Sequence, residues 1–215
     1  MLLNHSADFA TFEKTTVIKS KVPPLQMPPL RAAEIITSMA ANTLIETSAG
    51  WKEAGDIAVG DLVHTLDGGL VPVATAKIRT LPIYSTQLWY IPEGVFDNCD
   101  SLRLTAGQHI MITSTACERL FDAPDVLIPV NALAGYRDIC PCTSQSETRV
   151  IELAFEKEEI IYAQSGSLLM CPAADGETDD YFRTLSYGET RALLTLINGA
   201  HVGPDLAAPM FAAAA

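Results

Sequence analysis

Basic residues are scarce in this sequence. Its 215 residues include 14 Lys and Arg against 26 Asp and Glu, which gives a net charge of -12 at pH 7. The calculated pI is near 4.6. A surface with this balance does not attract the phosphate backbone of DNA or RNA electrostatically. We therefore expect no nucleic-acid partner.

Long hydrophobic runs are also absent. No stretch approaches the roughly 18 consecutive apolar residues of a membrane-spanning helix. Residues 1–14 mix His5, Asp8 and Glu13 and contain no apolar segment typical of a signal peptide. We expect a soluble protein with no membrane span and no cleavable signal, either cytoplasmic or secreted by a signal-independent route. The sequence does not indicate an oligomeric state.

Cysteine is sparse and unevenly placed. The five cysteines are odd in number and widely spread, unlike a disulfide scaffold. Cys140-Pro141-Cys142 is one residue shorter than the spacing of zinc knuckles and thioredoxin-like sites, so we interpret these residues as thiols in or beside a loop. The four histidines (His5, His64, His109, His201) lie far apart without a metal-binding motif. The sequence implies no metal site and no cofactor.

Hydrophobic residues make up 48% of the chain and charged residues only 19%, which is too apolar for disorder and sufficient for a core. The length suits one domain with short extensions, since domains run about 100–200 residues. Residues 1–37 carry a proline cluster and no sustained periodicity, so we expect an extended leader. A domain is predicted over 38–200 and a loose tail over 201–215.

Short segments rich in Val, Ile, Thr and aromatic residues recur along this domain, separated by turn residues. The pattern predicts an all-β domain rather than alternating β and α units. The predicted strands are Thr43–Thr47, Asp61–Leu66, Val71–Thr80, Tyr84–Tyr90, Ser101–Thr105, Gln108–Thr113, Val126–Val130, Arg149–Phe155 and Glu159–Ala163.

Two hairpin turns and one helix are specific enough to predict. Asp67-Gly68-Gly69 indicates a tight hairpin with positive φ values at a primed turn. A second hairpin is predicted through Glu156-Lys157-Glu158. Near the C-terminus, Gly188–Ile197 has the apolar face of a helix, which Asn198-Gly199 can end.

Five segments, taken in order, resemble the Hint domain of hedgehog proteins and inteins, in particular its bacterial branch. They are Thr43–Thr47, Ala58–Val63, Asp67–Gly69, Gln108-His109 and Val126–Val130. Gly60 can make a backbone turn and Asp61 can bond nearby amides where a strand begins. The resemblance spans about 38–196 and implies a pseudo-twofold horseshoe of short strands with one C-terminal helix.

The resemblance implies self-cleavage, in which a nucleophile at the first position of the domain attacks the preceding carbonyl. That position falls on Ser38, where the family usually has Cys. The resemblance assigns His109 to protonate the leaving nitrogen. Thr105 is a candidate to polarise the carbonyl, although the family's usual Thr lies one residue closer to the His, at Ala106 here. Thr105 therefore has to be redirected, for instance by a bulge at Gly107.

The resemblance also leads us to expect histidines at two later positions, where this chain has Glu152 and Glu158. The chain lacks the His-Asn ending of splicing inteins, so splicing is not expected. Two hypotheses remain. In the first, the module is autoproteolytic: an N–O acyl shift at Thr37/Ser38 followed by hydrolysis, with the protein's own N-terminal segment as substrate. In the second, it is a catalytically degenerate Hint fold that acts as an interaction or structural domain.

Overall fold

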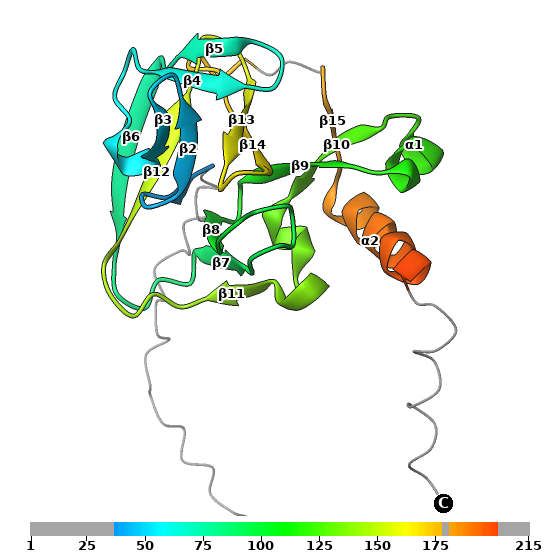
Figure 1. Ribbon diagram of the computed structural model, residues 1–215. Helices are drawn as coiled ribbons and strands as arrows, with labels where there is room; N and C mark the ends of the chain where they lie inside the picture. The colour runs from blue at the N-terminus through cyan, green and yellow to red at the C-terminus, as the bar shows by residue number, and fades with distance from the viewer. Residues whose placement is uncertain (1–36, 178–180, 202–215) are drawn as a thin grey trace, which may run out of the picture. The chain divides into compact units, whose positions relative to one another are not determined.

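The structure is a computed structural model that describes residues 37–177 and 181–201. The predicted leader, 1–37, and the predicted tail, 201–215, lie almost entirely outside these residues. The described residues belong to one compact unit. Their strands form two β-sheets, shown in Figure 1.

The first sheet has six strands, and the strand that follows Ser38 lies in its middle. Its strands all pair antiparallel. In spatial order they are β11 (Cys140–Cys142), β7 (Leu88–Ile91), β8 (Leu102–Thr105), β1 (Met39–Ala40), β12 (Thr148–Ala154) and β6 (Thr75–Leu81). The Cys-Pro-Cys segment is thus an edge strand, and the loop that begins at Thr143 lies directly beside it.

The second sheet has nine strands. Its order is β15 (Arg183–Thr184), β10 (Asp125–Pro129), β9 (His109–Thr113), β14 (Ser167–Cys171), β13 (Glu159–Ala163), β2 (Leu44–Thr47), β4 (Leu62–Thr65) and β5 (Gly69–Pro72), with β3 (Gly50–Glu53) on β2. Among the strands of the described residues, only β10 and β15 pair in parallel, and an isolated parallel bridge joins Phe155 and Ala173. Both sheets supply side chains to one apolar core, which includes Leu104, Ile151, Ile110 and Phe155.

Two α-helices and three short 3-10 helices complete the described part of the chain. The α-helices are α1 (Thr115–Phe121) and α2 (Tyr187–His201); the 3-10 helices are η1 (Ala54–Asp56), η2 (Val130–Leu133) and η3 (Tyr136–Asp138). Ser186 and Glu189 cap α2 reciprocally: Ser186 N–H donates to Glu189 Oε2 at 2.8 Å and Glu189 N–H to Ser186 Oγ at 3.3 Å. The helix buries Leu193 and Leu194. The predicted end at Asn198-Gly199 is wrong, because α2 continues to His201.

The helix α1 was not predicted. Ser114 caps it by accepting the Ala116 N–H at 3.2 Å, and Asp122 ends it in the left-handed region at φ 56°. At seven residues it is too short to show a clear apolar periodicity. The predicted all-β class with a C-terminal helix is nevertheless confirmed. No helix in the described part of the chain is long and apolar enough to cross a bilayer.

The first predicted hairpin is present as β4–β5, with Thr65 facing Gly69. The turn differs from the prediction, because only Gly69 has a positive φ, of 69°. Gly60 makes the predicted backbone turn at φ 90°. Asp61 Oδ2 accepts the Ala58 N–H at 2.9 Å, as predicted.

The second predicted hairpin is wrong. The strands on either side of residues 156–158 lie in different sheets: β12 pairs with β6 and β1, whereas β13 pairs with β14. The predicted strand Val71–Thr80 is likewise divided between β5 and β6. Each strand has a suitable local sequence, but the choice of partner depends on residues far away in the chain.

Candidate active site

Ser38 lies immediately before β1, a two-residue strand with a partner on each side. Met39 of β1 faces Leu104 of β8 and Ile151 of β12. Ser38 is buried, with 1% of its surface exposed. The residue predicted to be the nucleophile is therefore held inside the six-stranded sheet.

The backbone of Ser38 is bound by Thr105, the last residue of β8. The Ser38 N–H donates to Thr105 Oγ1 at 2.9 Å, and this hydroxyl donates to the Ser38 carbonyl oxygen at 3.1 Å. The backbone N–H of Thr105 donates to the same carbonyl at 2.9 Å. Three hydrogen bonds thus hold the peptide groups on both sides of the Ser38 α-carbon.

A turn after β8 explains why the Ser38 N–H bonds to the Thr105 side chain and not to the Thr105 carbonyl. The Gln108 N–H donates to the Thr105 carbonyl at 3.0 Å and closes a turn at Ala106 and Gly107. The carbonyl that would continue the sheet ladder is thereby occupied, and the Ser38 N–H bonds to the hydroxyl. A turn therefore brings Thr105 to Ser38, in place of the bulge considered from the sequence.

His109 begins β9, in the other sheet, and is half-buried. Its Nδ1 is buried and has no hydrogen-bond partner among the described residues. Burial lowers the pKa of His109 below its usual value, and the nearby Gly107 carbonyl, which favours the protonated ring, partly opposes this shift. The imidazole is therefore mainly neutral at neutral pH.

The Gly107 carbonyl connects His109 to the residue before Ser38. It accepts a hydrogen bond from Thr37 Oγ1 at 3.3 Å and faces the His109 ring. Sequence reasoning considered Gly107 only for a bulge and gave the Thr37 side chain no role. The structure thus brings Ser38 and Thr105 into direct contact, and it gives Thr37 and His109 a common neighbour.

Gln108 secures the start of β9. Its side chain is buried, and Nε2 donates to the Met170 carbonyl at 2.7 Å and to the His109 carbonyl at 3.1 Å. The sequence singled out Gln108 only as part of a motif with His109. Its bond to Met170 of β14 holds the backbone of His109 in the nine-stranded sheet.

The two glutamates at positions expected for histidine lie apart in the fold. Glu152 is on β12 in the six-stranded sheet, where its Oε1 lies 3.3 Å from Lys77 Nζ. Glu158 lies in the connection between the two sheets and lines a cavity with Tyr181 and Phe182. Only Glu152 shares a sheet with Ser38.

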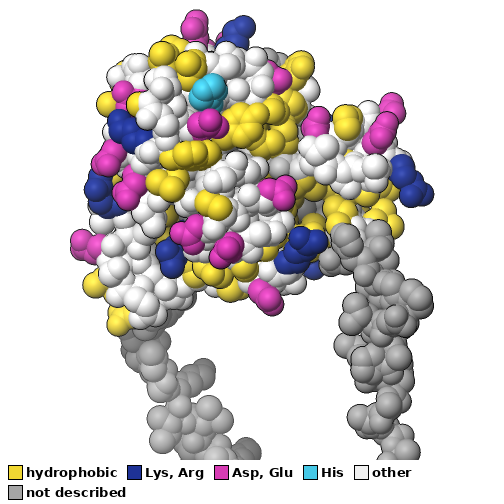
Figure 2. Space-filling model, in the orientation of Figure 1, with side chains coloured by type: hydrophobic (Ala, Val, Ile, Leu, Met, Phe, Trp, Pro, Cys, Tyr) yellow, Lys and Arg dark blue, Asp and Glu magenta, His cyan; other side chains and the backbone are white. Residues whose placement is uncertain are grey.

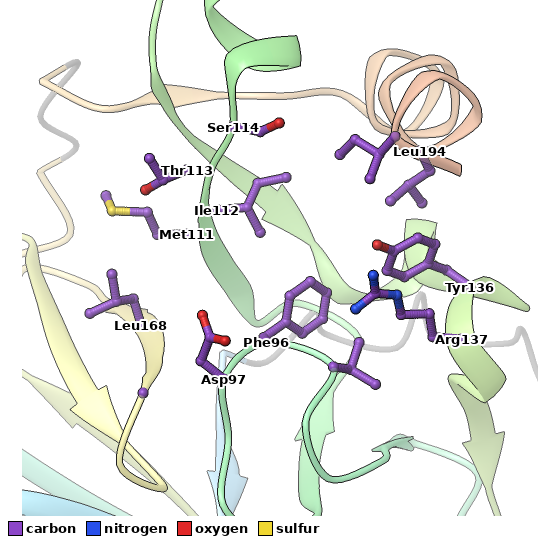
Figure 3. Close-up of a pocket in the computed structure, with 13 residues that line it drawn as sticks. Phe96, Asp97, Met111, Ile112, Thr113, Ser114, Tyr136, Arg137, Leu168 and Leu194 are labelled. Atoms are coloured by element: carbon purple, nitrogen blue, oxygen red, sulfur yellow. The ribbon is translucent and has the colours of Figure 1, made fainter. Parts of the chain in front are cut away.

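A cavity of about 360 Å³ lies elsewhere, between the loop after β7, the β9 strand and α2. Figure 3 shows the rings of Phe96 and Tyr136 side by side in its wall, with Arg137 next to Tyr136. The ring centroids are 6.3 Å apart. Ser38, Thr105 and His109 do not line this cavity, so it is separate from the candidate site.

The charged side chains of the described residues do not form a metal-binding cluster. Among the described residues, no three His, Cys, Asp or Glu side chains are placed to hold one ion. Figure 2 shows acidic and basic side chains interspersed on the visible face, around a band of apolar side chains. Ser38, Thr105 and His109 supply two hydroxyl groups and one imidazole.

Several solved structures are similar to this chain. An intein-like domain from Clostridium thermocellum is 14% identical, with a TM-score of 0.44, over 63% of this chain and 99% of that one. The gp41-1 intein is 17% identical, with a TM-score of 0.41, over 63% and 98%. The MchDnaB-1 intein is 20% identical, with a TM-score of 0.37, over 63% and 99%. No curated protein matches the sequence.

The family comparison is decisive for residues 37–168, which match the family model of the Hint domain. This match covers more than half of the 215 residues and begins one residue before Ser38. It includes the strands that carry Thr105 and His109. The chain therefore belongs to the Hint domain family.

Proposed function

We propose that this protein cleaves its own backbone between Thr37 and Ser38. Ser38 Oγ attacks the carbonyl carbon of Thr37, the bond from that carbon to the Ser38 nitrogen breaks, and an ester joins the two parts of the chain. The nitrogen takes up a proton and becomes a free amine. Water then hydrolyses the ester and releases residues 1–37 with a new carboxylate.

One observation carries the proposal. The hydroxyl of Thr105 lies 2.9 Å from the nitrogen of the peptide bond to be broken, at a buried position. The same hydroxyl also binds the Ser38 carbonyl, 3.1 Å away. These contacts favour a role for Thr105 in holding the amide, in place of the carbonyl polarisation predicted from the sequence. Restricting a reacting amide in this way can contribute several kcal/mol to catalysis, about 7–11 kcal/mol in the best cases.

His109 is proposed as the acid that protonates the leaving nitrogen. Its imidazole faces the Gly107 carbonyl, which also binds the side chain of Thr37. Because burial lowers the pKa of His109, its protonated fraction increases as the pH falls below the ordinary value near 6.5. If protonation of the nitrogen limits the rate, cleavage should therefore accelerate on mild acidification from neutral pH.

The test is the intact mass of freshly purified protein over time, beside Ser38→Ala, His109→Ala and Ser38→Cys variants. Wild type should separate into residues 1–37 and 38–215, and the two alanine variants should stay whole. His64→Ala serves as the control, because His64 lies on β4, away from Ser38, and should leave cleavage unchanged.

The other outcomes are equally informative. If wild type stays whole with added thiol or hydroxylamine while Ser38→Cys cleaves, the fold is competent and the native hydroxyl is inactive. If no variant cleaves, the proposal is wrong and the degenerate Hint fold, acting through binding, takes its place.

A further inference from the structure

The cavity between the loop after β7, β9 and α2 is built from residues that the candidate active site does not use. Its volume, about 360 Å³, falls within the range of pockets that hold small molecules, about 300–1,000 Å³. Leu194 and Ile197 of α2 form one wall, and α2 follows residues 37–168, which match the Hint domain. The cavity therefore exists because α2 packs against the Hint part of the chain.

The walls of this cavity offer apolar surface of two kinds. Ile112 and Leu168 supply aliphatic side chains from β9 and β14. Phe96 and Tyr136 supply two aromatic rings, whose planes are inclined by only 26°. Pockets for small molecules combine such surfaces with a few polar groups that orient the ligand. The rings and the aliphatic side chains suit a flat, apolar molecular body.

Two charged side chains, Asp97 and Arg137, line the same cavity. Figure 3 shows the ring of Phe96 between the Asp97 carboxylate and the Arg137 guanidinium. The guanidinium carbon of Arg137 lies 5.4 Å from the centroid of the Tyr136 ring. Among the described residues, neither charged group has an ion-pair partner. The cavity thus presents a cation and an anion on the two sides of an aromatic ring.

Both charged residues have a backbone conformation that residues other than glycine rarely adopt. The φ angle is 58° at Asp97 and 43° at Arg137. Aspartate tolerates the left-handed region better than arginine does. Strained residues of this kind persist only where the surrounding structure enforces them, and they cluster at sites that bind ligands. The two angles therefore point to a functional reason for holding these side chains at the cavity.

The loop that carries Asp97 is fixed from inside by Asn98. This side chain is buried, and its Nδ2 donates to two backbone carbonyls, at 2.9 and 2.8 Å. Its Oδ1 accepts the Phe96 N–H at 3.0 Å. Gly166 lets the next hairpin approach, because a Cβ there would lie 2.4 Å from the Asp97 carbonyl oxygen. The loop is therefore held on both sides.

The turn that carries Arg137 is fixed as well. Two backbone hydrogen bonds, of 2.8 and 2.9 Å, close residues 135–139. Directly before this turn, the Ala134 carbonyl accepts a hydrogen bond of 2.7 Å from Nη1 of Arg191, on α2. A site whose backbone is ordered in advance loses little conformational freedom when a ligand binds.

We propose that this cavity binds a small, flat, apolar molecule that carries a carboxylate at one end and a hydrogen-bond donor, hydroxyl or ammonium, at the other. Arg137 binds the carboxylate through its N–H donors, and Asp97 accepts a hydrogen bond from the donor group. The apolar body lies against the rings of Phe96 and Tyr136. Binding is reversible and forms no covalent bond, and it does not depend on the self-cleavage proposed above.

The first test is equilibrium dialysis of the full chain against p-coumarate, a flat molecule with a carboxylate at one end and a phenolic hydroxyl at the other. Ser38→Ala protein is used, so that the sample is the same whether or not wild type cleaves itself. We expect a Kd below about 1 mM, the weak end of specific binding. Absence of binding at that concentration would overturn the proposal.

Two analogues identify the groups that the cavity recognises. The uncharged p-coumaramide should bind at least about 10-fold more weakly, because it loses charge-assisted hydrogen bonds to Arg137. Cinnamate, which lacks the hydroxyl, should bind about 3-fold more weakly or worse, because it loses the bond to Asp97. Equal binding of all three would show that only the apolar body is recognised, and would contradict the assigned roles.

Arg137→Asn removes the guanidinium, and asparagine tolerates the left-handed conformation. It should weaken p-coumarate at least about 10-fold and change p-coumaramide less than about 2-fold. Arg149→Asn is the matched control, because Arg149 is an exposed arginine on β12 that does not line the cavity. An equal loss for the acid and the amide, or an equal loss in both variants, would overturn the role of Arg137.

Ile197→Trp tests the location of the ligand by filling the cavity from α2. Ile197 is half-buried, so a larger ring can enter the cavity without displacing the core. Binding of p-coumarate and of p-coumaramide should be lost, while thermal melting shows a folded protein. A folded variant that still binds both would place the ligand elsewhere. If this variant does not fold, Arg137→Asn still decides the proposal.

Discussion

Thr105 and Thr65 are two buried threonines that make the same kind of hydrogen bond, to partners at very different distances along the chain. Their exposed fractions are 2% and 3%. Each hydroxyl accepts a backbone N–H, that of Ser38 at 2.9 Å for Thr105 and that of Gly68 at 3.0 Å for Thr65. The first bond joins residues 67 positions apart, and the second closes a turn over three.

The Thr65 bond stabilises a local turn, whereas the Thr105 bond joins segments that are distant in the sequence. The Thr65 bond lies within the hairpin and depends only on the residues around Gly68 and Gly69. The Thr105 bond exists because β1 is inserted between β8 and β12. The long-range bond restrains the peptide bond that we propose is cleaved, so it is the bond to which we assign a functional role.

The largest expected effect is that of Thr105→Val. The substitution keeps the shape of the side chain and removes the hydroxyl at the Ser38 nitrogen. We expect cleavage to slow about 100-fold, because a small misplacement of reacting groups can cost that much. The intact-mass time course measures it. An unchanged rate would show that the restrained amide does not assist the reaction.

Thr65→Val is the matched change in the hairpin. Because Gly68 is exposed, water can replace the lost acceptor, so the free energy of unfolding should fall by only about 0.5–1.5 kcal/mol. Cleavage should proceed at the wild-type rate. Urea denaturation and the intact-mass assay measure the two quantities on the same samples. If Thr65→Val slows cleavage as much as Thr105→Val, the contrast between the two regions fails.

A smaller effect concerns His109 and acid. Burial lowers the pKa of His109, so the unfolded chain takes up this proton first as the pH falls below about 6.5. The folded state should therefore lose stability from that pH down through the lowered pKa. His109→Gln, which does not take up this proton, should show a flatter curve. Urea denaturation between pH 7 and pH 5 tests this in a Ser38→Ala background, and parallel curves would contradict it.

The smallest effect is expected for Asp61→Asn, at the start of β4. The Ala58 N–H, and then Lys52, lower the pKa of this exposed carboxyl. Its contribution to stability is present at neutral pH and disappears as the pH falls through the lowered pKa. The variant should melt slightly below wild type at pH 7 and equally at low pH. A difference that persists in acid would point to lost packing.

Local features of the fold were predictable where a few neighbouring residues decide them. Gly60 and Asp61 make the predicted turn and amide bond, and β4–β5 is the predicted hairpin. The hairpin predicted at 156–158 was wrong because strand pairing there depends on residues far away in the chain. Its charged residues suit a tight turn, but β12 already has partners on both edges in the six-stranded sheet.

The candidate site was predictable as a set of residue types. Ser38, Thr105 and His109 came from motifs and their spacing. The spacing also counted against Thr105, because it is one residue further from His109 than the family pattern requires. The turn at Ala106 and Gly107 resolves this conflict, since it occupies the Thr105 carbonyl and leaves the hydroxyl for Ser38.

By itself, the sequence determined the all-β class, most strand positions, the C-terminal helix and the Hint motifs, because each depends on side-chain patterns a few residues long. Only the tertiary structure decided which strands pair, and with that the neighbours of Ser38. Those neighbours come from β8 and β12, strands far from Ser38 along the chain. Their registers are set by long-range packing of the core, for which a short stretch of sequence carries no signal.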